Sequence, residues 1–131
     1  ARFLHRAHAV AREGGSVRAM VATIVADGGH VMGFGRPFVG YDERAPIMQA
    51  LLARRGRDQL PFVTLLREAE AAFASHKGLR SNAAAWAAAI LSDFGMSPEQ
   101  VHAVCHFWVS VCVYAHASFA GERGLVAPAS P

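Results

Sequence analysis

V-M-G-F-G-R-P-F-V-G-Y-D-E-R, residues 31–44, joins two segments with helical apolar spacing, and the rest of the chain is arranged around it. Its three glycines permit backbone angles that other residues avoid, and they let a ligand approach the main chain closely. Backbone N–H groups and arginine side chains together favour carboxylate or phosphate. The stretch therefore predicts either a seat for an anionic ligand or an ordinary connecting loop, and its own residues leave both interpretations open.

The segments on either side of this stretch have the 3.6-residue apolar period of amphipathic helices, and no stretch of useful length has the alternation of a β-strand. Ser16 and either Ser81 or Asn82 are placed to cap helices, and Pro61 suits a first helical turn. The sequence predicts an all-α fold with helices over residues 2–13, 17–27, 45–55, 61–74, 82–94 and from 98 onward.

Composition narrows the class of protein. A hydrophobic fraction of 53% against 18% charged residues excludes a disordered chain, and 131 residues suffice for one domain or a part of one. The chain begins at Ala1 without a methionine, which suggests a fragment or a processed protein. The net charge of +3 comes from basic residues that are scattered among acidic ones. This balance suits a phosphate-bearing small ligand, and we expect no nucleic-acid partner.

The last helix is unusual because residues 100–121 contain no Asp, Glu, Lys or Arg. A stretch of this length can span a bilayer. However, His102, His106 and Ser110 would be costly in lipid. We therefore predict no membrane span but a helix buried in a large core or a dimer interface; a membrane-anchored helical protein is the alternative.

Cys105 and Cys112 lie on that helix, roughly 10 Å apart at 1.5 Å per residue, which is too far for a disulfide. We expect both to be buried and reduced in a cytoplasmic protein.

Three groups of residues could carry chemistry. His102 and His106 have the i, i+4 spacing of some zinc ligands, but no nearby residue completes a site, so we predict buried structural histidines and no metal. His30 could contact a ligand or cap a helix. Asp42, Glu43 and Arg44 could form a network at a helix start, or Arg44 could bind a ligand.

Three stretches together resemble one family. The first is V-R-A-M-V-A followed by G-G-H-V-M-G-F-G-R-P-F-V-G-Y-D-E-R-A, and the second is G-L-R-S-N-A-A-A-W-A-A-A-I-L-S-D-F-G-M. The third is W-V-S-V-C-V-Y-A-H-A-S-F-A-G-E-R. In this order they are similar to three motifs of the citrate synthase family: P-G-F-G-H-P…D-P-R-A, P-N-V-D-F-Y-S-G…L-G-I and A-H-x-x-E. The resemblance covers about residues 16–123. The family includes methylcitrate synthases and citryl-CoA lyases.

The resemblance implies an all-α small domain over residues 16–98, preceded by an N-terminal helix over 1–15 and followed by a buried helix and tail over 99–131. That last part would return to a large domain, most of which this chain lacks. The resemblance also implies a homodimer with no metal, in which an acyl-CoA substrate lies in the cleft between domains beside a small carboxylate. The large domain would then be on the same chain or on a second subunit.

Carried over residue by residue, the resemblance assigns binding roles. Arg36, Arg44 and Asn82 would bind the carboxylate substrate. The residues that would bind CoA are Val31, Gly33, Phe34, Gly35, Lys77 and Arg80.

The family's catalytic residues are not retained. Arg36 stands in place of the loop histidine and Ala84 in place of the aspartate, and the spacer from Arg36 to Arg44 is one residue short. Alanine cannot abstract a proton, and arginine stays protonated at neutral pH. The resemblance thus implies an acyl-CoA-binding protein for carbon–carbon condensation or cleavage with an altered catalytic set. The alternative is a non-catalytic paralogue that dimerises.

Overall fold

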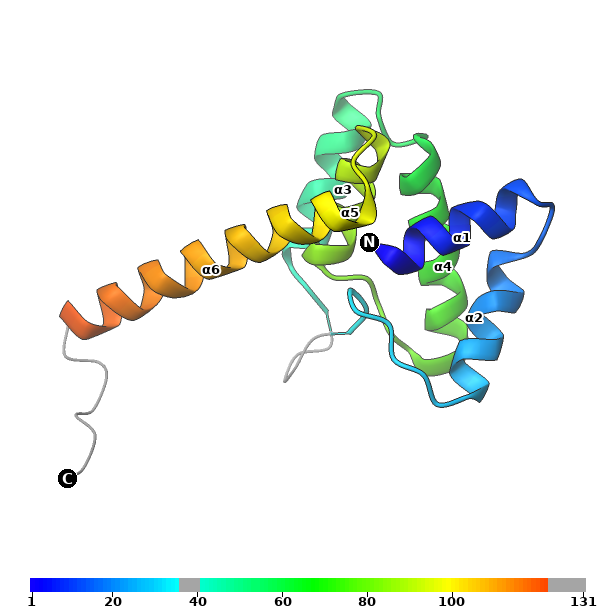
Figure 1. Ribbon diagram of the computed structural model, residues 1–131, viewed down its shortest axis with the longest axis horizontal. Coiled ribbons are helices and arrows are strands. Elements are labelled where there is room, and N and C mark those ends of the chain that lie inside the picture. The colour runs from blue at the N-terminus through cyan, green and yellow to red at the C-terminus, as the bar shows by residue number, and fades with distance from the viewer. Residues whose placement is uncertain (36–40, 123–131) are drawn as a thin grey trace.

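The computed structural model describes residues 1–35 and 41–122 (Figure 1). Over these residues the protein is all-helical, as predicted, and forms no β-strand beyond one isolated bridge between Phe34 and Ser81. The helices are α1 (Arg2–Arg12), α2 (Val17–Ala26), α3 (Arg44–Arg54), α4 (Pro61–Lys77), α5 (Ala83–Asp93) and α6 (Pro98–Glu122).

Side-chain caps fix three of the helix starts. Ser16 accepts a hydrogen bond from the backbone N–H of Ala19 at 3.2 Å, and Asn82 accepts from two N–H groups of α5. Ser97 and Gln100 form a reciprocal capping box before α6, with N–H to side-chain oxygen distances of 2.8 and 3.3 Å. The predicted cap at Ser16 is confirmed, and Asn82 rather than Ser81 caps α5.

The free backbone N–H groups at the start of α4 are hydrogen-bonded by a side chain from another part of the chain. Pro61 occupies its first turn as predicted, but Leu60, the residue at the cap, has no polar side chain. Asp93, at the end of α5, accepts hydrogen bonds from the N–H groups of Phe62 at 2.9 Å and Val63 at 3.1 Å. This carboxylate therefore joins the end of α5 to the start of α4, and its charge suits the positive end of the α4 dipole.

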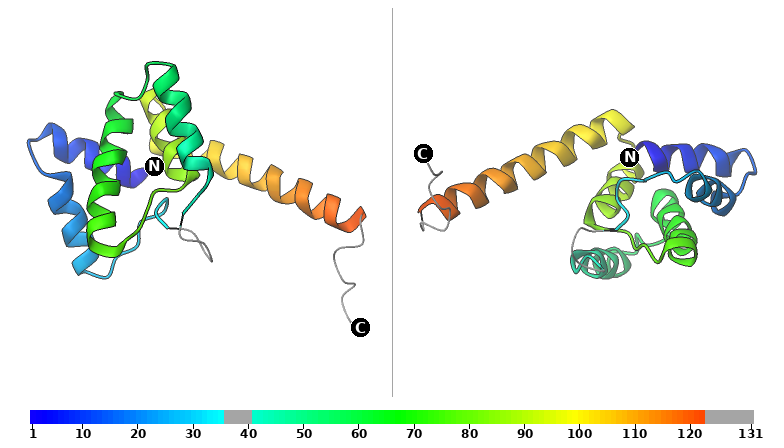
Figure 2. Two further views of the ribbon diagram at one scale, coloured as in Figure 1. Left: turned by 180° about the vertical axis from the view of Figure 1, so that it is seen from behind. Right: turned by 90° about the horizontal axis from the view of Figure 1, so that it is seen from below.

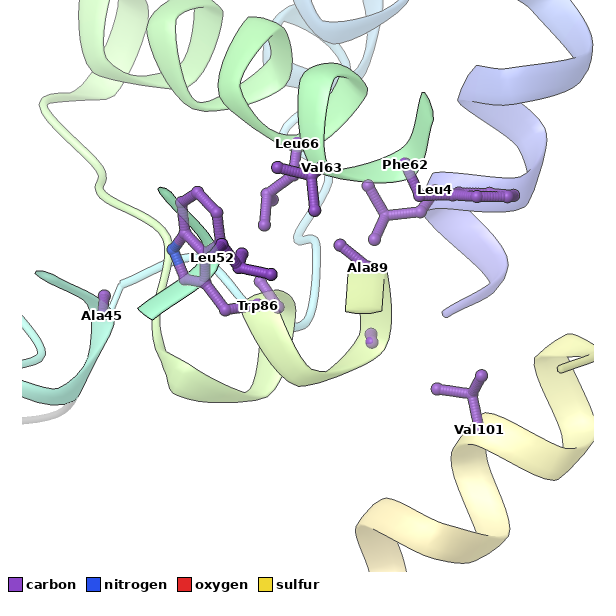
Figure 3. Close-up of a cluster of buried hydrophobic side chains, with 11 residues drawn as sticks. Leu4, Ala45, Leu52, Phe62, Val63, Leu66, Trp86, Ala89 and Val101 are labelled. Atoms are coloured by element: carbon purple, nitrogen blue, oxygen red, sulfur yellow. The ribbon is translucent and has the colours of Figure 1, made fainter. Parts of the chain in front are cut away.

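The core has two clusters of buried side chains, and α4 contributes to both. One cluster lies between α4 and α5 around fully buried Trp86 (Figure 3). The other lies between α4, α1 and α2 around Phe73. Leu4 belongs to the first cluster and Ala7 to the second, so α1 is packed into the same core as the helices that follow it.

Three aromatic rings connect the clusters to the glycine-containing segment. Phe34 lies 4.3 Å from Phe73 and 5.9 Å from Phe3, measured between ring centroids. Phe3 and Phe73 are themselves 5.9 Å apart. Phe34 is thus held between α1 and α4, which fixes the backbone of the segment that contains Gly33 and Gly35.

Helix α6 leaves the body of the protein after its first two turns (Figures 1 and 2). Val101 is buried and Cys105 is half-buried, whereas Cys112, His102 and His106 are exposed. The large apolar side chains beyond Cys105, including Phe107, Trp108 and Tyr114, are 47–77% exposed. These histidines and Cys112 are therefore not buried by the described residues of this chain, and their predicted burial in a larger core or a dimer interface stays a prediction.

The stretch Pro98–Ala120 is long and apolar enough to cross a bilayer, a test that the core helix of a soluble protein also passes. Ser110 donates to the carbonyl of His106 at 2.9 Å, and His116 lies 2.8 Å from the carbonyl of Cys112. These contacts lower the cost of two polar side chains in lipid, while the rings of His102 and His106 stack on each other, 6.0 Å apart. The absence of a membrane span stays a prediction.

Candidate functional site

The site is built on a pairing between two short segments that are far apart in the sequence. The N–H of Gly35 donates to the carbonyl of Arg80, and the N–H of Asn82 donates to the carbonyl of Gly33, both at 2.8 Å. Phe34 and Ser81 form the bridge between these bonds. The two stretches singled out in the sequence, the glycine-containing segment and the segment before α5, are therefore joined through their backbones.

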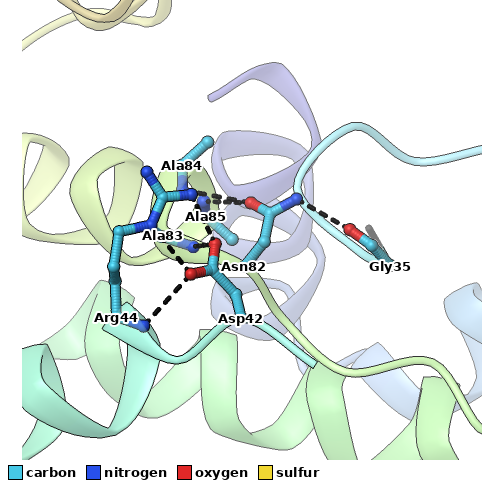
Figure 4. A network of polar contacts seen from close by, with 7 residues as sticks. All are labelled: Gly35, Asp42, Arg44, Asn82, Ala83, Ala84 and Ala85. Carbon is cyan, nitrogen blue, oxygen red and sulfur yellow. Dashed lines mark hydrogen bonds and ion pairs between the residues drawn. The ribbon is translucent and has the colours of Figure 1, made fainter. Parts of the chain in front are cut away.

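Asn82 strengthens this pairing with its side chain (Figure 4). Its Nδ2 donates to the carbonyl of Gly35 at 3.0 Å, and its Oδ1 accepts from the N–H groups of Ala84 at 3.0 Å and Ala85 at 3.3 Å. One amide thus caps α5 and holds the glycine-containing segment against the start of that helix. An aspartate could not donate the bond to Gly35.

Gly33 is required by its conformation and by its surroundings. Its φ of +103° is a conformation that residues with a Cβ rarely adopt. A Cβ at this position would lie 2.9 Å from the Cβ of Ala85, which is shorter than an ordinary carbon contact. The close approach between the segment and α5 therefore depends on glycine on one side and alanine on the other.

An ion pair holds the segment before α3 against the same helix start (Figure 4). Asp42 is 3% exposed and accepts two hydrogen bonds at 2.8 Å from the guanidinium of Arg44, and one at 2.9 Å from the N–H of Ala83. The hydrogen bonds from Arg44 hold the pKa of the Asp42 carboxyl well below its usual range, and the N–H of Ala83 acts in the same direction. The predicted helix-start network is confirmed for these two residues.

Arg44 nonetheless remains accessible, because its side chain is 60% exposed. Its edge toward Asp42 is occupied, so a carboxylate ligand would have to approach from the solvent side. A ligand-binding role for Arg44 stays a prediction.

A third set of contacts orients Ser81, the residue at the centre of the backbone pairing. Ser81 is buried; its backbone N–H and its hydroxyl both donate to Glu70 at 2.9 Å, and its hydroxyl accepts from the indole N–H of Trp86 at 2.8 Å. Nothing in the sequence pattern points to this role of Glu70. It fixes the segment before α5 to α4.

A cavity of about 640 Å³ opens beside this framework, between α1, α5, the glycine-containing segment and the start of α6. It is called the first cavity below. Most of its walls are apolar, and several belong to the buried core. Its lining includes five predicted site positions: Val31, Gly33, Phe34, Asn82 and Ala84.

A second cavity, of about 410 Å³, lies between the same segment and the end of α4. Lys77 and the rings of Phe34 and Phe73 are among its walls. His30, Val31 and Phe34 line both cavities, so the two share a wall. This place is consistent with a ligand contact for His30, which stays a prediction.

Not all predicted site residues meet at these cavities. Gly35 and Arg80 take part in the backbone pairing but line neither cavity, and neither does Arg44. Arg36 lies outside the described residues.

Sequence reasoning assigned no site role to several residues that line the first cavity. Met32, Ala88, Val101, His102 and Cys105 are among them. Helical spacing could have grouped Val101 with Cys105 and Ala84 with Ala88, because residues four apart share a face. The sequence does not indicate that these faces of α5 and α6 lie next to each other.

The chemistry available at the first cavity is limited. Ala84, where the resemblance expects a carboxylate, offers no proton acceptor, and the amide of Asn82 is occupied by backbone groups. The titratable side chains in its lining are Arg2, His30, Glu99, His102 and Cys105. Within residues 1–35 and 41–122, no three His, Cys, Asp or Glu side chains form a group that could hold a metal ion.

No family model matches the chain, and no curated protein or solved structure matches it either.

Replacement of Gly33 by alanine should destabilise the fold. The positive φ costs about 1–2 kcal/mol for a residue with a Cβ, and the contact with Ala85 adds about 1–3 kcal/mol of overpacking. Gly56→Ala is the matched control, because Gly56 also has a positive φ but has open space where a methyl group would lie. Urea unfolding should show a larger loss for Gly33→Ala, and equal losses would contradict the close approach.

Asp42→Asn should lower the free energy of unfolding by about 1–3 kcal/mol at pH 7, since Arg44 loses its charged partner. The folded-state pKa of Asp42 is depressed, so its contribution is fully present above its ordinary pKa of 3.8 and is lost as the pH falls below it. The difference between wild type and Asp42→Asn should therefore shrink from pH 7 to pH 3.

Asp58→Asn is the control for this experiment. Asp58 is 30% exposed and lies 4.0 Å from Arg67, so its pair should contribute little. A difference of the same size and pH dependence at both positions would rule out a special role for Asp42.

Proposed function

We propose that this chain binds an acyl-CoA thioester as the CoA-binding part of a citrate-synthase-like protein. The observation that supports this most is a pair of cavities that share lining residues in the glycine-containing segment. Val31 and Phe34 line both, Lys77 lines one and Ala84 the other. Two adjacent cavities, one beside a lysine and one with mostly apolar walls, suit an elongated ligand with an anionic end and an acyl end.

The second cavity suits the nucleotide end of CoA. Lys77 is exposed and supplies a positive charge for a phosphate. The half-buried ring of Phe34 offers apolar surface for an adenine. The basic end of α4 is not an N-terminus, so the charge of Lys77, and not a helix dipole, would attract the anion. Arg80 is exposed on the neighbouring segment and is the other predicted phosphate partner.

The first cavity suits the thioester end. Asn82 and Gly33 hold its edge in place through the backbone pairing, and Ala84 faces it without a charge. The reaction class that we propose is carbon–carbon condensation or cleavage with a carboxylate-bearing acceptor, Arg44 and Arg36 being the predicted carboxylate partners. The catalytic set differs from that of the family, because Ala84 cannot serve as the base.

The exposed apolar side chains of α6 call for a further domain or subunit around this chain. A large domain, on the same chain or on a second subunit, would cover the outer part of α6, where Phe107, Trp108 and Tyr114 are exposed. We propose a homodimer in the cytoplasm, with no metal, no nucleic acid and no membrane as partner.

Isothermal titration with CoA and acetyl-CoA tests the proposal. We expect both to bind, with a Kd that rises about three- to tenfold in Lys77→Ala because one charge-assisted contact is lost. Arg54→Ala is the control, since Arg54 is also exposed near a helix end but lines neither cavity. Absence of binding by wild type, or equal effects of the two variants, would contradict the proposal.

A second candidate function is that of a non-catalytic paralogue that dimerises. The exposed apolar side chains of α6 favour it, because exposed apolar surface of this extent typically marks a contact with another molecule. Size-exclusion chromatography with light scattering should then give a dimer or larger oligomer, and Trp108→Glu should shift it toward monomer. A monomeric wild type without CoA affinity would exclude both candidates.

A further inference from the structure

The first cavity has apolar inner walls, whereas the charged side chains in its lining are exposed to solvent. Its inner walls include Leu66, Ala85, Ala88 and Val101, which are all buried core residues. The charged side chains and histidines in its lining, Arg2, His30, Glu99 and His102, are all exposed, and the half-buried amide of Asn82 is already hydrogen-bonded to backbone groups. The cavity is thus an apolar recess with a polar entrance.

The recess exists because α5 presents small side chains to it. Ala84, Ala85 and Ala88 lie on one face of the helix, by the spacing of 84, 85 and 88. Opposite them, Val101 and Cys105 occupy successive turns of α6. Larger residues on α5 would fill this space and close the core against α6. The volume of about 640 Å³ lies within the usual range for small-molecule sites.

The recess adjoins the proposed position of the thioester. Ala84 and Asn82 line it at the edge where the glycine-containing segment meets α5, and the same segment also lines the cavity that contains Lys77. A ligand whose anionic end lies near Lys77 would run over His30 and Val31, which line both cavities, to bring its other end to Ala84 and Ala88. The part of the ligand in the recess would then be the acyl end, which is remote from the phosphates.

We propose that the first cavity binds an unbranched apolar acyl chain of several carbons, so that the substrate class is a medium-chain acyl-CoA and not acetyl-CoA. This inference rests on the proposed function, since it assumes a CoA thioester. Its physical basis is that each methylene of the ligand that leaves water for an apolar space favours binding, whereas a short acetyl group would stay at the entrance.

Titration with CoA, acetyl-CoA, butyryl-CoA and octanoyl-CoA tests this inference. The Kd should fall as the chain lengthens, by up to about fourfold for each methylene that becomes buried. The ratio of the Kd for acetyl-CoA to the Kd for octanoyl-CoA is the quantity to compare between variants. Equal Kd values for all four ligands would overturn the acyl-chain site while leaving the proposed CoA site intact, and no binding of any of them would overturn both.

Two substitutions at one exposed position probe the recess itself. Ala84→Leu fills its entrance and Ala84→Asp places a charge there, and both should reduce the ratio toward one. Ala50→Leu on α3 is the matched control, because Ala50 is exposed in a helix and lines neither cavity, so it should keep the wild-type ratio. A wild-type ratio in both Ala84 variants would overturn the inference. So would a change in oligomeric state on Ala84→Leu, which would identify the recess as a contact between copies of the chain.

Discussion

The backbone pairing of residues 33–35 with residues 80–82 is the contact on which the rest of the site depends. Two N–H to carbonyl bonds of 2.8 Å and the side chain of Asn82 join segments almost fifty residues apart. Loop closure over that distance costs entropy that these few bonds alone do not repay. The pairing persists because Phe34 on one side and Ser81 on the other are anchored in buried clusters, through Phe73 and through Trp86 and Glu70.

The local features of the fold could be predicted from the sequence, and the reasons are local as well. Ser16, Asn82 and Pro61 signal helix starts because a cap or a first-turn proline acts on neighbouring backbone groups. Asp93 carries no such signal, although it caps α4, because its partners lie about thirty residues away. Glu70 has the pattern of a solvated face for the same reason, since its partner Ser81 is on another segment.

The last helix shows where sequence reasoning about burial reaches its limit. An uncharged stretch of this length predicts burial, and its first two turns do bury Val101 against α5. The outer part has nothing among the described residues to pack against, so the exposure of Phe107, Trp108 and Tyr114 follows from the shape of the body and not from the composition of the helix. Burial is a property of two surfaces, and the sequence of one helix specifies only one of them.

Residues 33, 82 and 84 differ in what they contribute to the candidate site. Glycine at position 33 and asparagine at position 82 preserve geometry, because each is held by backbone contacts that another residue could not make. Alanine at position 84 offers no proton acceptor, and it fits the structure because it lets the segment and α5 share an uncharged recess. A charged side chain there would have to be hydrated or paired at the entrance of an apolar space. The framework and the recess are therefore physically compatible with each other, because the side chain at position 84 is small and carries no charge.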